Sequence, residues 1–191
     1  TVNSDSGTEN SDGLYRIDLA TGEEIERIGT VQSALLQTRI DVEGLALSPD
    51  RLLYGVDDES LKLFRIDTGN ALVDKNMDYD LKDLTKGKND FGMTFACDGS
   101  LYLTSVIRKT LYQVTIDDPT SAKPTVIGSE GSLGANISAI AAYGTPTRLY
   151  GLGNGTAGEN GSTAAKLYEI DLFTGVAKEI GPLGPAVAPY S

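Results

Sequence analysis

The sequence predicts an all-β protein of four similar repeats, the arrangement of a β-propeller. A five-residue motif occurs at 14–18, 63–67, 111–115 and 167–171. It consists of a leucine, an aromatic residue, a polar residue, an aliphatic residue and a further polar residue. Its aromatic residues lie 49, 48 and 56 residues apart, and a repeat of about 40–50 residues made of short strands is typical of propeller blades. The aliphatic residues of the motif are expected to be buried between blades: Ile17, Ile66, Val114 and Ile170.

Each complete repeat is expected to contain four antiparallel strands. The first strands are predicted at 42–47, 91–96 and 137–142, and the second strands, after turns rich in Pro, Asp and Gly, at 52–56, 101–106 and 149–152. The repeated motif forms the third strand. A fourth strand, clearest at 23–28 and 176–180, follows a turn marked by Thr21-Gly22, Thr68-Gly69 or Thr174-Gly175, where glycine tolerates positive φ. The sequence indicates no long amphipathic helix, and residues 30–38 are the one weak candidate for a short helix.

The two ends of the chain are expected to complete one blade together. Residues 186–190 resemble the first strand at 139–143, and the first repeat begins partway. One domain over residues 1–191 then contains repeats at 1–29 plus 183–191, 38–81, 84–128 and 132–181. Pairing of the terminal strands closes a ring of four blades without open edges and predicts a monomer. The alternatives are a fragment of a six- to eight-bladed protein, or half of a ring that a second chain completes.

Composition and charge exclude several classes of function. The chain has 27 acidic and 16 basic residues and a formal net charge of −11, which argues against nucleic acid or an anionic membrane as partner. No apolar run reaches the roughly 20 residues that a membrane span needs. Histidine is absent, so a Ser-His-Asp triad and histidine-ligated zinc are excluded. The single Cys97 has no partner for an internal disulfide.

One face of the predicted propeller carries the long polar loops. Loops that join fourth to first strands and second to third strands share a face, and here they span 4–13, 30–41, 57–60, 80–90 and 154–165. Long loops on a rigid scaffold commonly carry function. The candidate residues for binding a ligand or protein partner are Asp57, Asp58, Glu59 and Asn154. The alternative, that these loops are only solvent-exposed connections, explains them equally well.

A second group of polar residues marks the entrance of the axial channel. When the first strands are aligned on the small residues 44, 92 and 139, one shared position holds Asp41, Asn89 and Asn136. Glu43 lies two residues deeper on the same side of its strand as Asp41. Converging oxygen donors suit calcium, which takes six to eight oxygen ligands. Polar residues at strand entries also satisfy backbone groups of the preceding turn, so both explanations remain open.

Residues 41–50, which read DVEGLALSPD, resemble the repeats of secreted bacterial β-propellers. Residues 41–106 also loosely resemble the calcium-dependent gluconolactonase and paraoxonase-like propellers, in which a Glu-Gly pair and an Asn-Asp pair on inner strands supply metal ligands. The resemblance implies that Glu43-Gly44 and Asn89-Asp90 contribute to a calcium site. The chain departs from that family because Phe91, rather than an asparagine, aligns with Glu43, and because the family ring has six blades.

Two functions are compatible with these features of the sequence. The first is a non-enzymatic, secreted or periplasmic propeller that binds an unidentified ligand or protein on its long-loop face and holds a structural calcium. The second is a calcium-dependent lactonase or esterase. No catalytic acid or base can be assigned, because the paired carboxylates lie in loops.

Overall fold

The structure is a computed structural model that describes residues 2–3, 13–33, 39–81, 84, 89–118, 121–153 and 165–183. These residues form β-strands and turns and contain no helix. Among them, no helix has the length and apolar character that a membrane span requires. The chain divides into two compact units, one of residues 1–88 and 116–122 and one of residues 89–115 and 123–191. Each unit is described by itself below.

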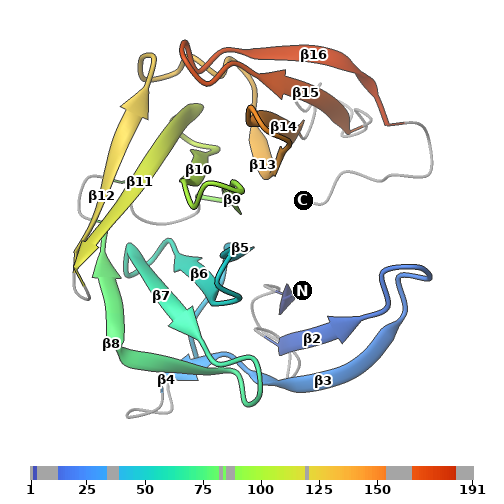
Figure 1. Ribbon diagram of the computed structural model, residues 1–191, viewed down its shortest axis with the longest axis vertical. Helices are drawn as coiled ribbons and strands as arrows, with labels where there is room; N and C mark the ends of the chain where they lie inside the picture. The colour runs from blue at the N-terminus through green and yellow to red at the C-terminus, as the bar shows by residue number, and fades with distance from the viewer. Residues whose placement is uncertain are drawn as a thin grey trace. The chain divides into compact units, whose positions relative to one another are not determined.

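The first compact unit contains blades one and two (Figure 1). Blade one is antiparallel, in the order β1 (Val2–Asn3), β2 (Gly13–Ile17) and β3 (Glu24–Thr30). Blade two is antiparallel, in the order β5 (Gly44–Leu47), β6 (Leu53–Asp57), β7 (Lys62–Ile66) and β8 (Leu72–Asp80). A short strand, β4 (Gln32–Ser33), pairs in parallel with β8.

The second compact unit contains blade four and most of blade three. Blade three has the strand order β9 (Phe91–Phe95), β10 (Leu101–Ser105), β11 (Thr110–Asp118) and β12 (Ser121–Ile127). Blade four is antiparallel, in the order β13 (Ile137–Tyr143), β14 (Arg148–Gly153), β15 (Lys166–Ile170) and β16 (Ala177–Pro182). The predicted all-β, propeller-like class is therefore confirmed, although no sheet of described residues closes into a ring.

Two local features differ from the patterns in the sequence. The candidate helix over 30–38 does not form at Gln32–Ser33, where β4 pairs with β8 instead; residues 34–38 lie outside the described part. The left-handed residue of the β7–β8 turn is Ala71, with φ of 61°, rather than Gly69. The predicted pairing of residues 186–190 with the N-terminal blade also lies outside the described residues, so closure stays a prediction.

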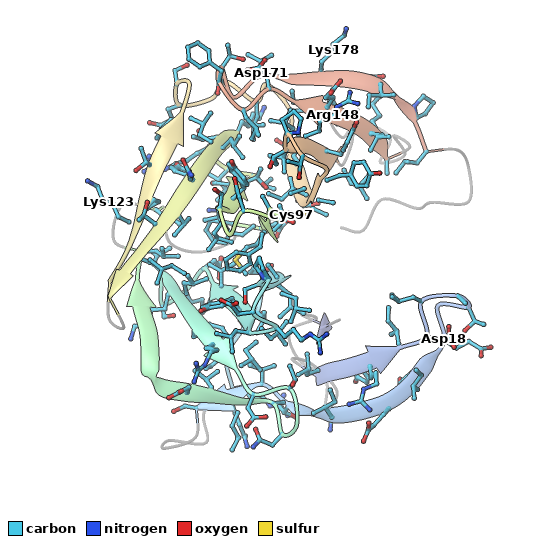
Figure 2. The ribbon with its side chains drawn as sticks, in the orientation of Figure 1. Asp18, Cys97, Lys123, Arg148, Asp171 and Lys178 are labelled. Atoms are coloured by element: carbon cyan, nitrogen blue, oxygen red, sulfur yellow. The ribbon has the colours of Figure 1, made fainter. Side chains whose placement is uncertain are left out.

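An aspartate at the end of the repeated motif shapes each of three turns between third and fourth strands. Asp18, Asp67 and Asp171 each accept a bond at the main-chain oxygen from the residue four positions later, which is Gly22, Ala71 or Gly175. Figure 2 labels Asp18 and Asp171 at these turns. The Asp171 carboxylate also accepts hydrogen bonds from the N–H groups of Thr174 at 2.7 Å and Phe173 at 2.9 Å. These two bonds hold the pKa of Asp171 below its usual value.

Each compact unit has an apolar core between its two blades. In the first, the core contains Leu14, Val31, Val42, Leu53, Phe64, Ile66, Ala71 and Val73. In the second, it contains Ala96, Tyr102, Leu111, Leu133, Ile137, Leu149, Tyr168 and Ile170. Ile66, Val114 and Ile170 are buried as predicted, with 2%, 5% and 3% of their surface exposed. Ile17 is only half-buried.

The inner strands of blades three and four approach each other closely. A Cβ built at Gly92 would lie 2.5 Å from the Thr104 hydroxyl and 3.2 Å from the backbone of Ala139, so a larger residue here would require its neighbours to shift. The fully buried hydroxyl of Thr104 accepts a hydrogen bond from the Gly92 N–H at 3.1 Å and donates one to the Ile137 carbonyl at 2.9 Å. One side chain of β10 therefore ties β9 to β13.

Candidate cation site

Two neighbouring segments of blade two bring three carboxylates together. Val42 is buried in the core with 1% of its surface exposed, so Asp41 and Glu43 on either side of it direct their side chains away from that core. The Glu43 N–H donates to the Val56 carbonyl at 2.9 Å, which extends the β5–β6 pairing toward the site. Asp58 comes directly after β6 and is buried, with 3% exposed.

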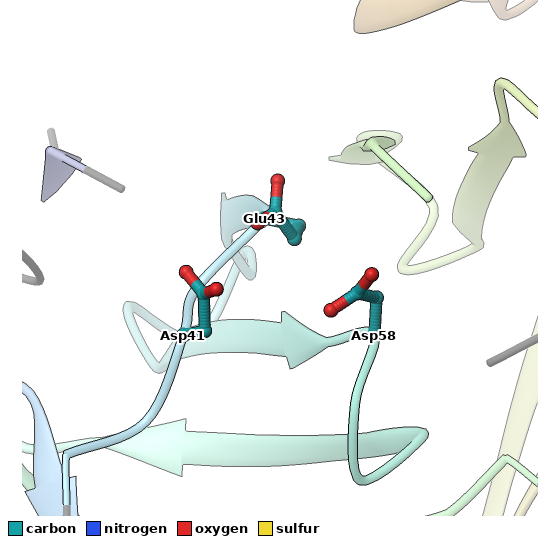
Figure 3. Close-up of side chains that lie close together, drawn as sticks. All are labelled: Asp41, Glu43 and Asp58. Carbon is teal, nitrogen blue, oxygen red and sulfur yellow. The ribbon is translucent and has the colours of Figure 1, made fainter. Parts of the chain in front are cut away.

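Carboxylate oxygens of Asp41, Glu43 and Asp58 all lie within 4.8 Å of one another. Figure 3 shows Asp41 and Glu43 on the segment that leads into β5 and Asp58 beyond the end of β6. Calcium–oxygen distances are about 2.3–2.6 Å, so two ligands on opposite sides of one ion lie about 4.6–5.2 Å apart. The three carboxylates are therefore close enough to bind a single ion of the size of calcium.

The residues predicted for the ligand-binding face differ in burial and in their contacts. Asp57 is buried, with 8% exposed, and caps the β6–β7 turn by accepting from the Glu59 N–H at 2.8 Å and from the Ser60 hydroxyl. Asp58 belongs to the carboxylate cluster. Asp57 and Asp58 were expected on an exposed loop. This is wrong, because the turn buries both side chains. Glu59 is exposed, and Asn154 lies outside the described residues.

Asn89 and Asp90, from the predicted metal set, lie in the second compact unit. Asn89 is buried, with 1% exposed, and its Oδ1 accepts from the Ser105 hydroxyl at 3.0 Å and the Ile107 N–H at 3.1 Å. Asp90 is exposed, and its carbonyl accepts from the Val106 N–H at 3.1 Å. The oxygen of Asn89 thus stabilises the β10–β11 turn, as capping of a turn by an Asx side chain does.

Asn136 departs from the register expected from alignment of the first strands. In β13, Ala139 pairs with Leu152 but Ile137 pairs with Gly153, so Ser138 forms a β-bulge. The extra residue shifts Asn136 by one position along its strand partner. Asn136 is half-buried. The bulge moves it out of the position that Asp41 and Asn89 share. The alignment of the sequence had no gap and therefore did not include this shift.

Blade three shows the same backbone without the three carboxylates. Strand pairing aligns Gly44, Val56 and Leu63 of blade two with Gly92, Thr104 and Leu111 of blade three. In this register the counterparts of Asp41, Glu43 and Asp58 are Asn89, Phe91 and Val106. The turns that follow also match, since Leu61 and Lys109 both have left-handed φ, of 53° and 48°. The blade fold therefore does not require acidic residues at these three positions.

A family model described as a repeat of unknown function (DUF6923) matches residues 2–138. The chain belongs to this family. No curated protein sequence matches it. The match covers the predicted repeats at 38–81 and 84–128 and the N-terminal part of the first repeat. It carries no statement of activity, so the family assignment supports the repeat architecture of the chain.

Solved structures with the same fold come from proteins of different function. Virginiamycin B lyase from Staphylococcus aureus is similar with a TM-score of 0.52 at 14% identity, over 92% of this chain and 50% of the lyase. Hydrazine synthase from Kuenenia stuttgartiensis is similar with a TM-score of 0.52 at 14% identity, over 91% of this chain and 44% of that one. A protein of unknown function from Bacteroides thetaiotaomicron is similar with a TM-score of 0.52 at 14% identity, over 90% of this chain and 45% of that one.

These likenesses show the fold alone, and the chain spans about half the length of the structures it resembles. One structure of the lyase, bound to quinupristin, is of a catalytically inactive variant with a histidine replaced by alanine. The present sequence contains no histidine.

Proposed function

We propose that this chain is a non-enzymatic binding module that holds a calcium ion in blade two, between Asp41, Glu43 and Asp58. The observation that carries the proposal is the placement of three carboxylates within 4.8 Å of one another, one of them almost fully buried. Three negative charges at this separation repel one another, most strongly where water is excluded. A divalent cation between them replaces the repulsion with attraction.

The comparison of blades two and three supports a role for the carboxylates beyond folding. Blade three builds the same strands and the same turn with Asn89, Phe91 and Val106 in the equivalent places. Acidic residues that the blade fold does not need are explained by a ligand of opposite charge. Carboxylate oxygens are the ligands that calcium prefers.

The bound ion would join the segment before β5 to the turn after β6. Three carboxylates leave some of the six to eight positions around calcium for backbone oxygens, water or the oxygen atoms of a bound ligand. Glu59, which is exposed on the same turn, lies beside this position in the chain. We therefore propose that an oxygen-bearing ligand or protein partner binds here. We also propose a secreted or periplasmic location, because residues 41–50 resemble the repeats of secreted bacterial β-propellers.

Thermal or chemical unfolding with calcium and with a chelator tests the proposal. Calcium at 100 times its dissociation constant is expected to add about 2.7 kcal/mol to the free energy of unfolding, because it binds only the folded chain. Asp58→Asn should remove most of this gain, and Glu59→Gln, on the same turn, should keep it. Unfolding that is indifferent to millimolar calcium would contradict the cation site. Hydrolysis of lactones or aryl esters that depends on calcium would instead establish the enzymatic alternative.

A further inference from the structure

The end of blade two that carries its tight turns contains a pocket of about 470 Å³. Its lining comes from residues 51–53, at the start of β6, and from residues within 65–74, between the end of β7 and the start of β8. All of these residues are described, and all belong to one blade of the first compact unit. Sites for small molecules commonly have volumes of about 300–1,000 Å³, so the pocket is large enough to bind one.

The pocket and the carboxylate cluster lie at opposite ends of β6. The pocket contains Leu53, the first residue of the strand, whereas Asp58 of the cluster directly follows Asp57, the last residue. No residue belongs to both the pocket and the cluster. The pocket is therefore a second candidate site, and it does not rest on the proposed cation.

Apolar residues form much of the lining of this pocket. Leu53, Ile66 and Val73 pair with one another across β6, β7 and β8, and they have only 9%, 2% and 7% of their surface exposed. Leu52 and Leu72, which also line the pocket, are half-buried. Because burial of apolar surface favours association, the pocket suits a ligand with an apolar body.

Most charged and polar groups of the lining already bind one another. The Asp67 carboxylate accepts hydrogen bonds from the Gly69 N–H at 2.7 Å and from the side-chain amide of Asn70 at 3.3 Å. Arg65 forms an ion pair with Asp74, with 2.6 Å between Nη2 and Oδ2. Both carboxylates of the lining therefore have donors within the blade, and the charge of Arg65 has a counter-charge.

Arg51 is the charged residue of the lining that lacks such a partner. It is exposed, and its side chain forms no hydrogen bond or ion pair with the described residues. Its φ is 64°, where blade three has Gly99 with φ of 87°. Both residues form the same turn, because the N–H of each donates to the carbonyl three residues earlier, at 2.9 and 3.0 Å. Glycine adopts this conformation without the cost that arginine has, so the turn itself does not explain Arg51.

We propose that this pocket binds a small organic anion, whose apolar body packs on Leu52 and Leu72 and whose carboxylate pairs with Arg51. A guanidinium group can donate two parallel hydrogen bonds to a carboxylate. The net charge of the chain is −11, which repels anions at a distance. Binding therefore requires the apolar contact together with the local charge, and this requirement disfavours small inorganic anions.

Titration with 2-naphthoate, which has an apolar ring system and one carboxylate, tests the proposal. Amide chemical shifts of the 15N-labelled protein should change first at residues 51–53 and 65–74. 2-Naphthalenemethanol has the same rings without the charge and should bind about tenfold or more weakly, since a hydrogen bond between charged groups is lost. Binding should be the same with a chelator present, so the result does not depend on the cation site. Shift changes confined to other parts of the chain, or equal binding of the two compounds, would overturn the proposal.

Arg51→Gly separates binding from folding. The variant has the residue of blade three and should bind 2-naphthoate about tenfold or more weakly, while its melting temperature stays equal or rises. A purely structural role of Arg51 would instead lower the melting temperature. Lys109→Gly is the matched control, because Lys109 is a cation with φ of 48° outside the pocket, and this variant should bind like the wild type. Unchanged binding by Arg51→Gly, or an equal loss in both variants, would overturn the role of Arg51.

Discussion

The carbonyl oxygen of Thr174 occupies the place that a Cβ at Gly128 would take. Gly128 also has a φ of 73°, a conformation that L-residues other than glycine adopt at a cost. We expect Gly128→Ala to lower the free energy of unfolding by about 1–2 kcal/mol through φ and by a further 1–3 kcal/mol, approximately, through the clash. Denaturant unfolding measures the sum.

Gly134→Ala separates these two effects. Gly134 has a similar φ of 67°, but a Cβ there would have nothing within 4 Å among the described residues. This variant should lose only the contribution from φ. Equal losses for Gly128→Ala and Gly134→Ala would mean that the approach of Gly128 to Thr174 is looser in solution.

Ile66 and Ile17 occupy the same position of the motif but differ in burial. Ile66→Ala removes a side chain that is 2% exposed and should cost about 2–5 kcal/mol, the range for a large-to-small change in a core. Ile17→Ala removes a half-buried side chain and should cost clearly less. Denaturant unfolding of the two variants makes the comparison, and a greater loss at Ile17 would contradict the difference in burial.

Replacing the carboxylate cluster with the residues of blade three tests whether the acids serve a cation. The triple variant Asp41→Asn/Glu43→Phe/Asp58→Val is expected to fold, because blade three forms the same strands and the same turn with these residues. Its melting temperature should not respond to calcium. A variant that fails to fold would show that the cluster has a structural role in blade two that blade three fulfils otherwise.

The turn at Asp171 should make a pH-dependent contribution to stability. Hydrogen bonds from the N–H groups of Thr174 and Phe173 lower the pKa of Asp171. A carboxyl with a lowered pKa in the folded state stabilises the fold above the pKa of the unfolded chain, and this contribution is lost as pH falls through the folded pKa. Asp171→Ala should therefore lower the melting temperature at pH 7, and the difference should shrink below about pH 4.

Asp50→Ala provides the comparison for that experiment. Asp50 is an exposed carboxylate in the turn between β5 and β6. Its substitution should change the melting temperature little at either pH. If Asp171→Ala and Asp50→Ala shift the melting temperature equally at pH 7, the hydrogen bonds to Asp171 do not contribute measurably.

The strands of each blade were predictable because local signals agree. The motif at 63–67 combines alternating apolar residues with a following turn, and the structure places β7 at Lys62–Ile66. The left-handed Ala71 was not predictable from residue type, because glycine at position 69 is the stronger turn signal. The hydrogen bonds from residue 71 to Asp67 and from Leu72 to Asn70 set the turn instead.

The candidate site was predictable only in part. Asp41 and Glu43 follow from their positions before an inner strand. Asp58 reads in sequence as one of a run of exposed charges, and its place in the cluster depends on how the turn after β6 folds back, which is a tertiary property. The sequence did contain one indication of this role. When the second strands of blades two and three are aligned, Asp58 takes the position of the apolar Val106. A carboxylate where the equivalent repeat has valine is not needed to form the blade and therefore indicates a functional role.

The hydrogen bonds of the Thr104 hydroxyl affect how the second compact unit unfolds. This hydroxyl forms hydrogen bonds with Gly92 in β9 and Ile137 in β13. The Thr94 hydroxyl in β9 also accepts a hydrogen bond from the Ala142 N–H in β13 at 3.2 Å. Separation of β9 from β13 therefore breaks these hydrogen bonds. Deuterium should therefore replace the amide protons of Gly92 and Ala142 at similar, slow rates, through one shared opening of both blades. Blades three and four, although they are copies of one repeat, would then unfold as a single cooperative unit.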